Sequence, residues 1–367
     1  MKARWVKREE KEMKIVSIEP TPSPNSMKIN LDESLPNNET RNYNKGDDLT
    51  HAPEYIQKLF QIEGVKNLYH VADFIALERN PRVPWEAILP EARAVFGEAV
   101  ESKETVNQPL ESYGEVKVLV QMFRDIPLQV KLDDGNEEKR FGLPPLFMNA
   151  VMEASEGTPN YVMERKWVEQ SVRYGNMDEI GQDVVEELVA SYDEERVKFL
   201  VEKAKQLDLE EEDKVPMKEE PKPQKLTFEI LDHPDWKVRY AALDRMDDPT
   251  VDDIPLLAKA LEDDKMSIRR LATAYLGMIE DKAVLPYLYK ALQDKVVTVR
   301  RTAGDCLSDL GFKEAMPQMI QSLKDSSKLV RWRAAMFLYE VGDETALAAL
   351  EEAKNDPEFE VKMQIEM

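Results

Sequence analysis

An aspartate recurs every 31 residues through the last third of the chain, at Asp232, Asp263, Asp294, Asp325 and Asp356. A basic residue follows each aspartate six or seven positions later, and these residues are Arg239, Arg269, Arg300, Arg331 and Lys362. A fixed repeat of this length is typical of a solenoid, in which each unit buries its apolar face only against its neighbours. We call these ten charged residues the ladder. It predicts a stacked helical region over residues 226–367.

Apolar residues keep the same phase as the ladder. Counted from the ladder arginine, an alanine recurs three positions on and a leucine seven on, at Ala272, Ala303, Ala334, Leu276, Leu307 and Leu338. Steps of three and four residues place side chains on one face of a helix. Gly311 and Gly342 come directly after this face, where a helix can end in a left-handed residue.

A second helix in each unit is indicated by prolines, again 31 residues apart, at Pro255, Pro286 and Pro317. Proline fits the first helical turn because the N–H that it lacks would have no intrahelical partner there. Each unit is therefore expected to be helix, turn, helix.

The run from Asp294 through Arg300 to Ala303 resembles the short HEAT-like repeats that also occur in phycobilin lyases. The resemblance implies an all-α, armadillo-type solenoid in which the aspartate and arginine side chains interact along the stack. We expect the aspartates to cap helices and the arginines to tie adjacent loops. A ligand-binding role for the same charges is the alternative.

Two tryptophans follow repeat loops, Trp236 and Trp332. Large aromatic side chains contribute much of the energy of protein interfaces, so both are candidate partner-binding residues. Packing between repeats is the alternative role for each.

The charge of the chain argues against nucleic acid as a partner. The 367 residues carry a formal net charge of −22, whereas phosphate binding requires a basic surface. Nucleic acid could bind only if the arginine clusters at 269–270, 300–301 and 331–333 formed a local basic stripe. The ladder aspartates would largely neutralise such a stripe. No stretch has the roughly 18 apolar residues of a membrane span, and no signal peptide is visible, so we expect a cytoplasmic protein.

The residues that usually carry redox or metal chemistry are few. The single cysteine, Cys306, lies on the inward face of a predicted repeat helix and is expected to be a small buried hydrophobe. The three histidines, His51, His70 and His233, do not share a helix at ligand spacing. We therefore expect no catalytic residue, no metal and no cofactor.

The front of the chain predicts an α+β domain over residues 13–100. The charged segment 1–12 reads as a disordered extension, and Met13 is a candidate for the natural start. A strand at 13–18 precedes three alternate prolines, which predict an edge or a loop before a strand at 27–31. A helix at 52–60, strands at 65–71 and 73–78 and a helix at 85–96 follow.

This domain closely resembles the amino-terminal domain of the Nfu/NifU proteins. The resemblance rests on the stretch 21–27, the turn 59–65, the strand 73–75 and Trp85. In that family the iron–sulfur cluster is held by a separate domain with a Cys-x-x-Cys motif, which this sequence lacks. Only the fold is implied, with protein docking and a structural platform as its two open roles.

A middle α+β domain is predicted over residues 113–206. Strands are expected at 115–123 and 128–132, a helix at 143–154, an extended segment at 161–174 and one or two helices at 180–204. The segment 207–225 is rich in Glu, Lys and Pro and predicts a flexible linker. The solenoid is accordingly expected to move relative to the front half.

The complete multidomain arrangement resembles the conserved virulence factor C family. That resemblance implies support of virulence-factor expression, with no catalytic activity to transfer onto residues. The first hypothesis is a cytoplasmic adaptor that binds unidentified protein partners through its solenoid and its Nfu-like domain. The alternative is an accessory protein of iron–sulfur metabolism, which would have to bind iron through carboxylates, His51 or His70.

Overall fold

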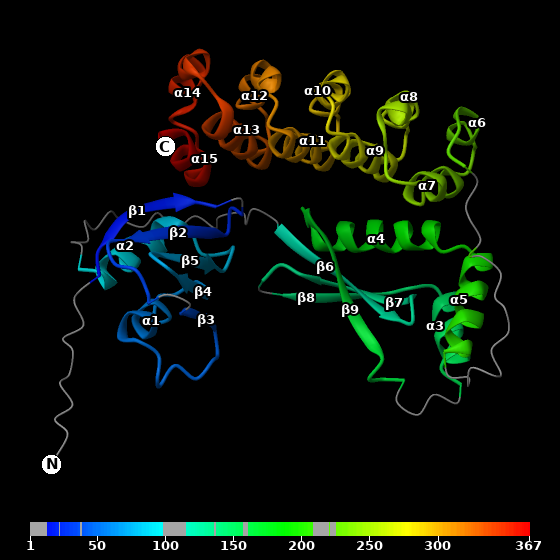
Figure 1. The fold of residues 1–367 in the computed structure, drawn as a ribbon, viewed down its shortest axis with the longest axis horizontal. Helices are drawn as coiled ribbons and strands as arrows, with labels where there is room; N and C mark the ends of the chain where they lie inside the picture. Colours follow the sequence, from blue (N-terminus) through cyan, green and yellow to red (C-terminus); the bar gives the residue numbers. More distant parts are fainter. Residues whose placement is uncertain are drawn as a thin grey trace. The chain divides into compact units, whose positions relative to one another are not determined.

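The computed structural model describes residues 13–21, 23–36, 39–97, 115–135, 137–156, 161–207, 220 and 225–367. The expected extension at 1–12 and nearly all of the expected linker at 207–225 lie outside these residues. The chain divides into two compact units, Met1–Tyr113 and Gly114–Met367 (Figure 1). None of the helices in the described ranges is long and apolar enough to cross a membrane.

The first unit is an antiparallel sheet with two helices, which confirms the predicted α+β fold. Its strand order is β1-β2-β5-β4-β3. The strands are β1 Ile15–Pro20, β2 Ser26–Leu31, β3 Thr40–Asn44, β4 Val65–Val71 and β5 Phe74–Arg79, and the helices are α1 Glu54–Leu59 and α2 Trp85–Val95. Strand β3 was not predicted. Its polar sequence gives no apolar alternation, because every residue in it is exposed or half-buried.

The proline-rich segment behaves as predicted. It follows β1, which is an edge strand paired with β2. The backbone carbonyl of Pro24 accepts a hydrogen bond of 3.0 Å from the indole N–H of Trp85, which is fully buried. This bond joins the segment to the start of α2, and it satisfies a donor that burial would otherwise leave without a partner.

The second unit begins with a four-stranded antiparallel sheet in the order β8-β7-β6-β9. The strands are β6 Glu115–Phe123, β7 Ile126–Asp133, β8 Glu138–Gly142 and β9 Arg165–Tyr174. The helices are α3 Pro145–Ala154, α4 Met177–Ser191 and α5 Glu194–Gln206. The predicted extended segment is β9, and the predicted helical stretch is two helices because Asp193 caps a new one at α5. The short, polar β8 was not predicted.

Two clusters of buried side chains hold these helices to the sheet. Phe123 and Ile126 pack with Phe147 of α3 and Leu200 of α5 at one end. Val130 and Leu132 of β7 pack with Ile180 of α4 at the other. Helix α4 lies over β7 and β8, which leaves part of the β6–β9 face uncovered by it.

The rest of the second unit is the predicted solenoid. Its longer helices are α7 Trp236–Asp244, α9 Met266–Met278, α11 Val297–Leu310, α13 Lys328–Val341 and α15 Phe359–Glu366. Its shorter helices are α6 Phe228–Leu231, α8 Ile254–Ala260, α10 Leu285–Ala291, α12 Met316–Ser322 and α14 Leu347–Ala353. Figure 1 shows the longer helices in one row and the shorter helices in another. The helix-turn-helix unit is thus confirmed.

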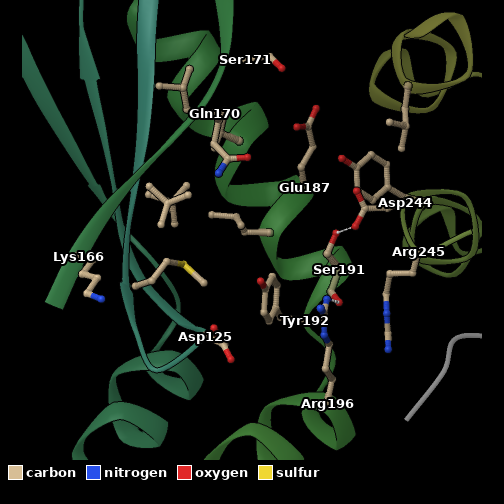
Figure 2. A pocket seen from close by; sticks show the side chains of 18 of the residues that line it. Asp125, Lys166, Gln170, Ser171, Glu187, Ser191, Tyr192, Arg196, Asp244 and Arg245 are labelled. Atoms are coloured by element: carbon tan, nitrogen blue, oxygen red, sulfur yellow. Dashed lines mark hydrogen bonds between the residues drawn. The ribbon is translucent and has the colours of Figure 1, made fainter. Parts of the chain in front are cut away.

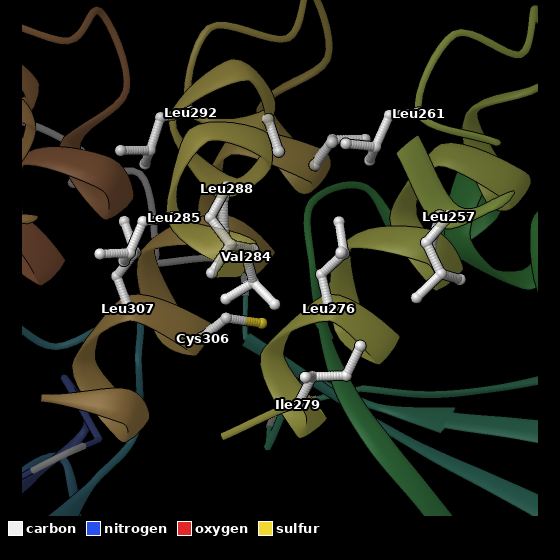
Figure 3. Close-up of a cluster of buried hydrophobic side chains, with 14 of the residues drawn as sticks. Leu257, Leu261, Leu276, Ile279, Val284, Leu285, Leu288, Leu292, Cys306 and Leu307 are labelled. Carbon is white, nitrogen blue, oxygen red and sulfur yellow. The ribbon is translucent and has the colours of Figure 1, made fainter. Parts of the chain in front are cut away.

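The predicted apolar phase forms the core between the two rows. The repeated alanines are fully buried, and the repeated leucines are buried beside them, as in Leu276 and Leu307. Figure 3 shows these two leucines near Leu288 of the neighbouring short helix α10 and near Val284, which directly precedes it. Each unit therefore buries its apolar face against the next, as a solenoid requires.

The predicted helix ends are right for the prolines and for one of the two glycines. Pro255, Pro286 and Pro317 each lie in the first turn of a short helix. Gly311 ends α11 in the left-handed region, with φ +62°. Gly342 ends α13 in an extended conformation with φ −64°, so the expected left-handed residue is absent there. Gly342 is instead close to the Leu338 carbonyl, and a Cβ atom would collide with that oxygen.

Candidate functional site

Each ladder arginine binds the ladder aspartate of the next repeat rather than that of its own. Arg269 donates from Nε and Nη2 to the two carboxylate oxygens of Asp294, at 2.7 and 3.0 Å. The same two-pronged pair recurs between Arg239 and Asp263, Arg300 and Asp325, and Arg331 and Asp356. Such bidentate pairs are among the stronger charge-assisted hydrogen bonds.

The ladder also holds the backbone of the loops. The third guanidinium nitrogen of Arg269 donates to the carbonyl of Asp263, in its own repeat, at 2.9 Å. Asp294 Oδ1 accepts the N–H of Val296 at 2.8 Å at the start of α11. Loop ends of two repeats are thereby joined, which supports the structural role of the charges. At the two ends of the ladder, Asp232 binds Lys259 instead of an arginine, and Lys362 is exposed.

The pKa values of two ladder residues are shifted in the directions expected for paired charges. Hydrogen bonding to Asp263 raises the pKa of Arg239, although burial opposes the shift. Burial alone would raise the pKa of Asp294, but the hydrogen bonds from Arg269 and the Val296 amide outweigh it and hold the pKa below its usual value. Arg239 and Asp294 are therefore each stabilised in the charged form by their partners.

The two candidate tryptophans lie in different surroundings. Trp332 is fully buried, with the guanidinium groups of Arg301 and Arg333 over its ring at 5.4 and 5.3 Å, so it does not present a surface to a partner. Trp236 is half-buried, and the Lys265 ammonium lies 4.5 Å from its ring centre. Packing is therefore the role that the structure supports for Trp332, whereas Trp236 keeps an accessible edge.

Cys306 is buried in the repeat core, as predicted. Burial raises the pKa of its thiol to about 12, so the thiolate that nucleophilic chemistry needs is strongly disfavoured. Within the described residues, no three His, Cys, Asp or Glu side chains are grouped as a metal site would require. His70 is also buried, and its Nδ1 lies 2.6 Å from the Tyr55 hydroxyl.

The middle domain packs against the solenoid inside the second unit. Helix α4 packs against α7 (Figure 1), and Glu187 of α4 connects the sheet to α9. Glu187 accepts from Arg173 of β9 at 2.7 Å and from Arg270 of α9 at 3.2 Å. The expected free movement of the solenoid relative to the front half is therefore wrong for the middle domain.

Further polar contacts extend this interface. Lys265, directly before α9, binds Glu186 at 2.7 Å, and Ser191 donates to Asp244 of α7 at 2.6 Å. The Arg301 guanidinium lies 4.9 Å from the Tyr174 ring, at the end of β9. Burial would raise the pKa of Glu187, but Arg270 and Arg173 outweigh that effect and lower it. The carboxylate thus stays ionised between two arginines.

A cleft of about 860 Å³ lies beside this interface. Its lining comes from β6, β9, α4, α7 and α9, together with the turns at Asp125 and Met163 and the start of α5. Figure 2 shows Glu187, Ser191 and Tyr192 on one side and Lys166 and Gln170 of β9 on the other. Its apolar lining is Val118, Val120, Met122, Val168, Leu188 and Leu271, with Val184 and Met163.

Positive charge predominates in the lining of the cleft. Six basic side chains line it, namely Arg124, Lys166, Arg173, Arg196, Arg245 and Arg270. Four acidic side chains line it, namely Asp125, Glu164, Glu187 and Asp244. Arg196 and Arg245 both reach Glu220, at 2.8 and 3.7 Å. Burial and the charge of Arg196 lower the pKa of Arg245, which shows that the two cations lie close together.

Sequence reasoning missed this cleft and its residues. Glu187 and Arg173 are 14 residues apart, and Arg270 is a further 83 residues from Glu187. Nothing in their local patterns links them, because a carboxylate on a helix surface usually faces water. The one available signal was the arginine directly after the ladder arginine, at Arg270 and Arg301, which was considered only as part of arginine clusters for nucleic-acid binding.

Comparisons with known proteins match all three regions. A sequence model of the family described as Virulence factor matches residues 121–201. The model described as Scaffold protein Nfu/NifU N terminal matches 16–103, and the HEAT repeats model matches 224–308 and 297–367. These matches confirm the Nfu-like domain and the HEAT-like repeats.

Several relatives extend over most of the chain. The uncharacterized protein YpgR of Bacillus subtilis is 57% identical over 274 residues, which are 74% of this chain and 71% of that protein. Conserved virulence factor C of Staphylococcus saprophyticus is 45% identical over 274 residues, which are again 74% of this chain and 71% of that protein. Among solved structures, protein SAV1430 from Staphylococcus aureus shares 42% identity over 23% of this chain and 98% of its own, with a TM-score of 0.21.

Proposed function

This chain belongs to the conserved virulence factor C family, and from that premise we propose that it is a non-catalytic cytoplasmic adaptor that binds protein partners. Its relatives bear the name conserved virulence factor C, and the proposed process that the adaptor serves is the expression of virulence factors. Binding of a protein is the usual task of HEAT-type stacks, because they present side chains at regular spacing over a long surface.

The observation that carries the proposal is how the solenoid is built. Its ladder charges are used between repeats, and the longer helices α7 and α9 carry the middle domain. The row of shorter helices remains as a surface for partners. Leu347 on α14 is 62% exposed there and provides a position at which contact with a partner can be probed.

The proposal of a non-catalytic role is supported by the pairing and protonation of the buried ionisable groups. Glu187 is fixed between two arginines, the Cys306 thiol is held protonated, and Asp244 accepts from Ser191 without a histidine beside it to act as a base. We therefore assign these groups to structure rather than to chemistry.

The test is photo-crosslinking in living cells with the full chain. A photoreactive residue is placed at Leu347 of the solenoid or at Tyr69 of the Nfu-like unit, which is 40% exposed. We expect a discrete adduct at one or both positions, absent from a chain without the photoreactive residue. If neither position gives an adduct above that background, the adaptor proposal fails.

The second candidate, an accessory role in iron–sulfur metabolism, is supported by the match of residues 16–103 to the Nfu/NifU amino-terminal model. It predicts iron in protein purified without air, held through carboxylates, His51 or His70. Metal analysis of such a preparation, with His51→Ala and His70→Ala compared with the parent chain, decides it. An iron content at background would exclude this role.

A further inference from the structure

Strand β9 has a long free edge. Within the described ranges it pairs with β6 alone, at one end of the order β8-β7-β6-β9. It has ten residues, Arg165–Tyr174, so it presents a long row of outward N–H and C=O groups. An edge of this kind is a template for pairing with another extended segment.

Apolar surface lies next to that edge. Val168 of β9 is 43% exposed, and Met163 at the mouth of the cleft is 82% exposed. Behind them the cleft is lined by Val118 and Val120 of β6 and by Leu188 of α4. A strand edge that only needed protection from aggregation would not be expected to have an open apolar cleft beside it.

The charge of the cleft indicates what would bind. Its lining carries six basic and four acidic side chains, although the whole chain has a net charge of −22. Lys166 is exposed at the start of β9, and Arg196 and Arg245 lie across the cleft from it (Figure 2). An occupant with acidic side chains would therefore complement a positive region on an otherwise acidic protein.

We propose that the cleft binds an extended segment of a partner protein in which acidic and apolar residues alternate, added as a strand to the free edge of β9. The segment's backbone pairs with β9, and alternate side chains enter the cleft over Val168. This rests on the proposed adaptor function and identifies the place and the kind of partner.

The other face of β9 does not add to the preference for acidic side chains. Trp167 projects there, with the Lys131 ammonium 4.9 Å and the Arg140 guanidinium 5.8 Å from its ring. Both cations already bind Glu138, at 3.1 and 2.8 Å, and they lie on β7 and β8, which β6 and β9 separate from the free edge. The charge that favours acidic side chains therefore comes from the cleft, where Lys166 is exposed on the same strand as Val168.

A free small anion fits the cleft less well than a strand. Arg173 and Arg270 share Glu187, and Arg124 binds Glu164 at 2.6 Å. A small anion would have to compete with these carboxylates for the arginines. An added strand keeps the ion pairs and gains its main attachment from backbone hydrogen bonds at the free edge.

The experiment uses the full chain and a fluorescent eight-residue peptide in which glutamate and valine alternate. We expect saturable binding by fluorescence anisotropy, lost when alternate backbone amides of the peptide are N-methylated and lost when lysine replaces glutamate. Lys166→Glu and Val168→Glu should each weaken binding about tenfold or more. Lys198→Glu, an exposed charge reversal on α5 outside the cleft lining, should leave binding unchanged.

Three results would overturn the proposal. They are an absence of saturable binding, equal binding of the N-methylated peptide, and a concentration-dependent dimer that Val168→Glu dissociates. The last result would assign the edge of β9 to a second copy of this chain. Because the in-cell crosslinks at Leu347 and Tyr69 are independent of the peptide, an adduct there together with a failed titration rejects the cleft and keeps the adaptor.

Discussion

Arg300 and Asp325 are 25 residues apart and form a bidentate pair, with Nε and Nη2 of the arginine 2.8 and 3.0 Å from the two carboxylate oxygens. The same guanidinium donates to the carbonyl of Asp294 at 2.9 Å. One side chain therefore holds loop ends of two successive repeats. Both members of the pair are largely shielded from water, at 14% and 13% exposed.

Arg300→Ala should destabilise the solenoid by roughly 2–4 kcal/mol, because it leaves a largely buried carboxylate without its cation. Denaturant unfolding of the second unit measures the change. Lys282→Ala is the matched control, since it removes an exposed pair with Glu314 and should leave the midpoint where it was. Unchanged stability of Arg300→Ala with lost partner binding would instead make the ladder a binding site.

Glu187→Gln should loosen the middle domain from the solenoid. The change keeps the shape of the side chain but leaves the cations of Arg173 and Arg270 facing each other. We expect a loss of about 2–4 kcal/mol and faster hydrogen exchange in α4 and α9. Glu186→Gln, one residue away in a more exposed pair with Lys265, should have the smaller effect. Exchange in α4 that stays at the parent rate would contradict the role of Glu187.

The first unit should lose stability as the pH falls from about 6.5 to about 4. Burial, aided by the charge of Arg41, lowers the pKa of His70 from 6.5 to about 4. Between these values the unfolded chain takes up a proton that the folded chain does not, so up to about 3 kcal/mol is present at neutral pH and lost on acidification. Hydrogen-exchange protection of β4 and β5 in denaturant, measured at several pH values, reports this loss. In His70→Gln that part of the pH dependence should disappear.

Gly277→Ala should destabilise the packing of α9 on α11. A Cβ atom at this position would collide with Sγ and Cβ of Cys306. Overpacking of this kind costs about 1–3 kcal/mol, which should appear as a lower thermal midpoint. Met278→Ala, an exposed change at the next position of α9, is the control. If the thermal midpoint of Gly277→Ala were as high as that of the control, α9 and α11 would accommodate the added methyl group without loss of stability, which would contradict the prediction.

The repeat region could be predicted from sequence because each of its interactions recurs. Asp294, Arg300 and Ala303 have counterparts 31 residues away on either side, so a pattern reveals what one position would not. The pairing partner of Arg300 could not be read in the same way. Because the aspartates and arginines recur at the same 31-residue spacing, Arg300 could pair with Asp294 of its own repeat or with Asp325 of the next. Only the stacking of the helices decides which aspartate it reaches.

The elements that were missed lacked such a signal. Strands β3 and β8 are edge strands whose side chains are nowhere fully buried, so they show no apolar alternation. Glu187 looked like one acid among 72, and its burial depends on arginines from two other elements. Sites built from charges distant in sequence become visible only when the parts are packed together.

The contact between Glu187 and Arg270 also limits how the number of repeats can change during evolution. A whole repeat inserted between α7 and α9 would bring its own ladder pair, but it would carry Arg270 about 10 Å from the carboxylate that it serves. A repeat added after α13 would disturb no such contact with α4. We therefore expect relatives of different length to gain or lose repeats towards the carboxyl-terminal end, while the first repeats are inherited together with the middle domain.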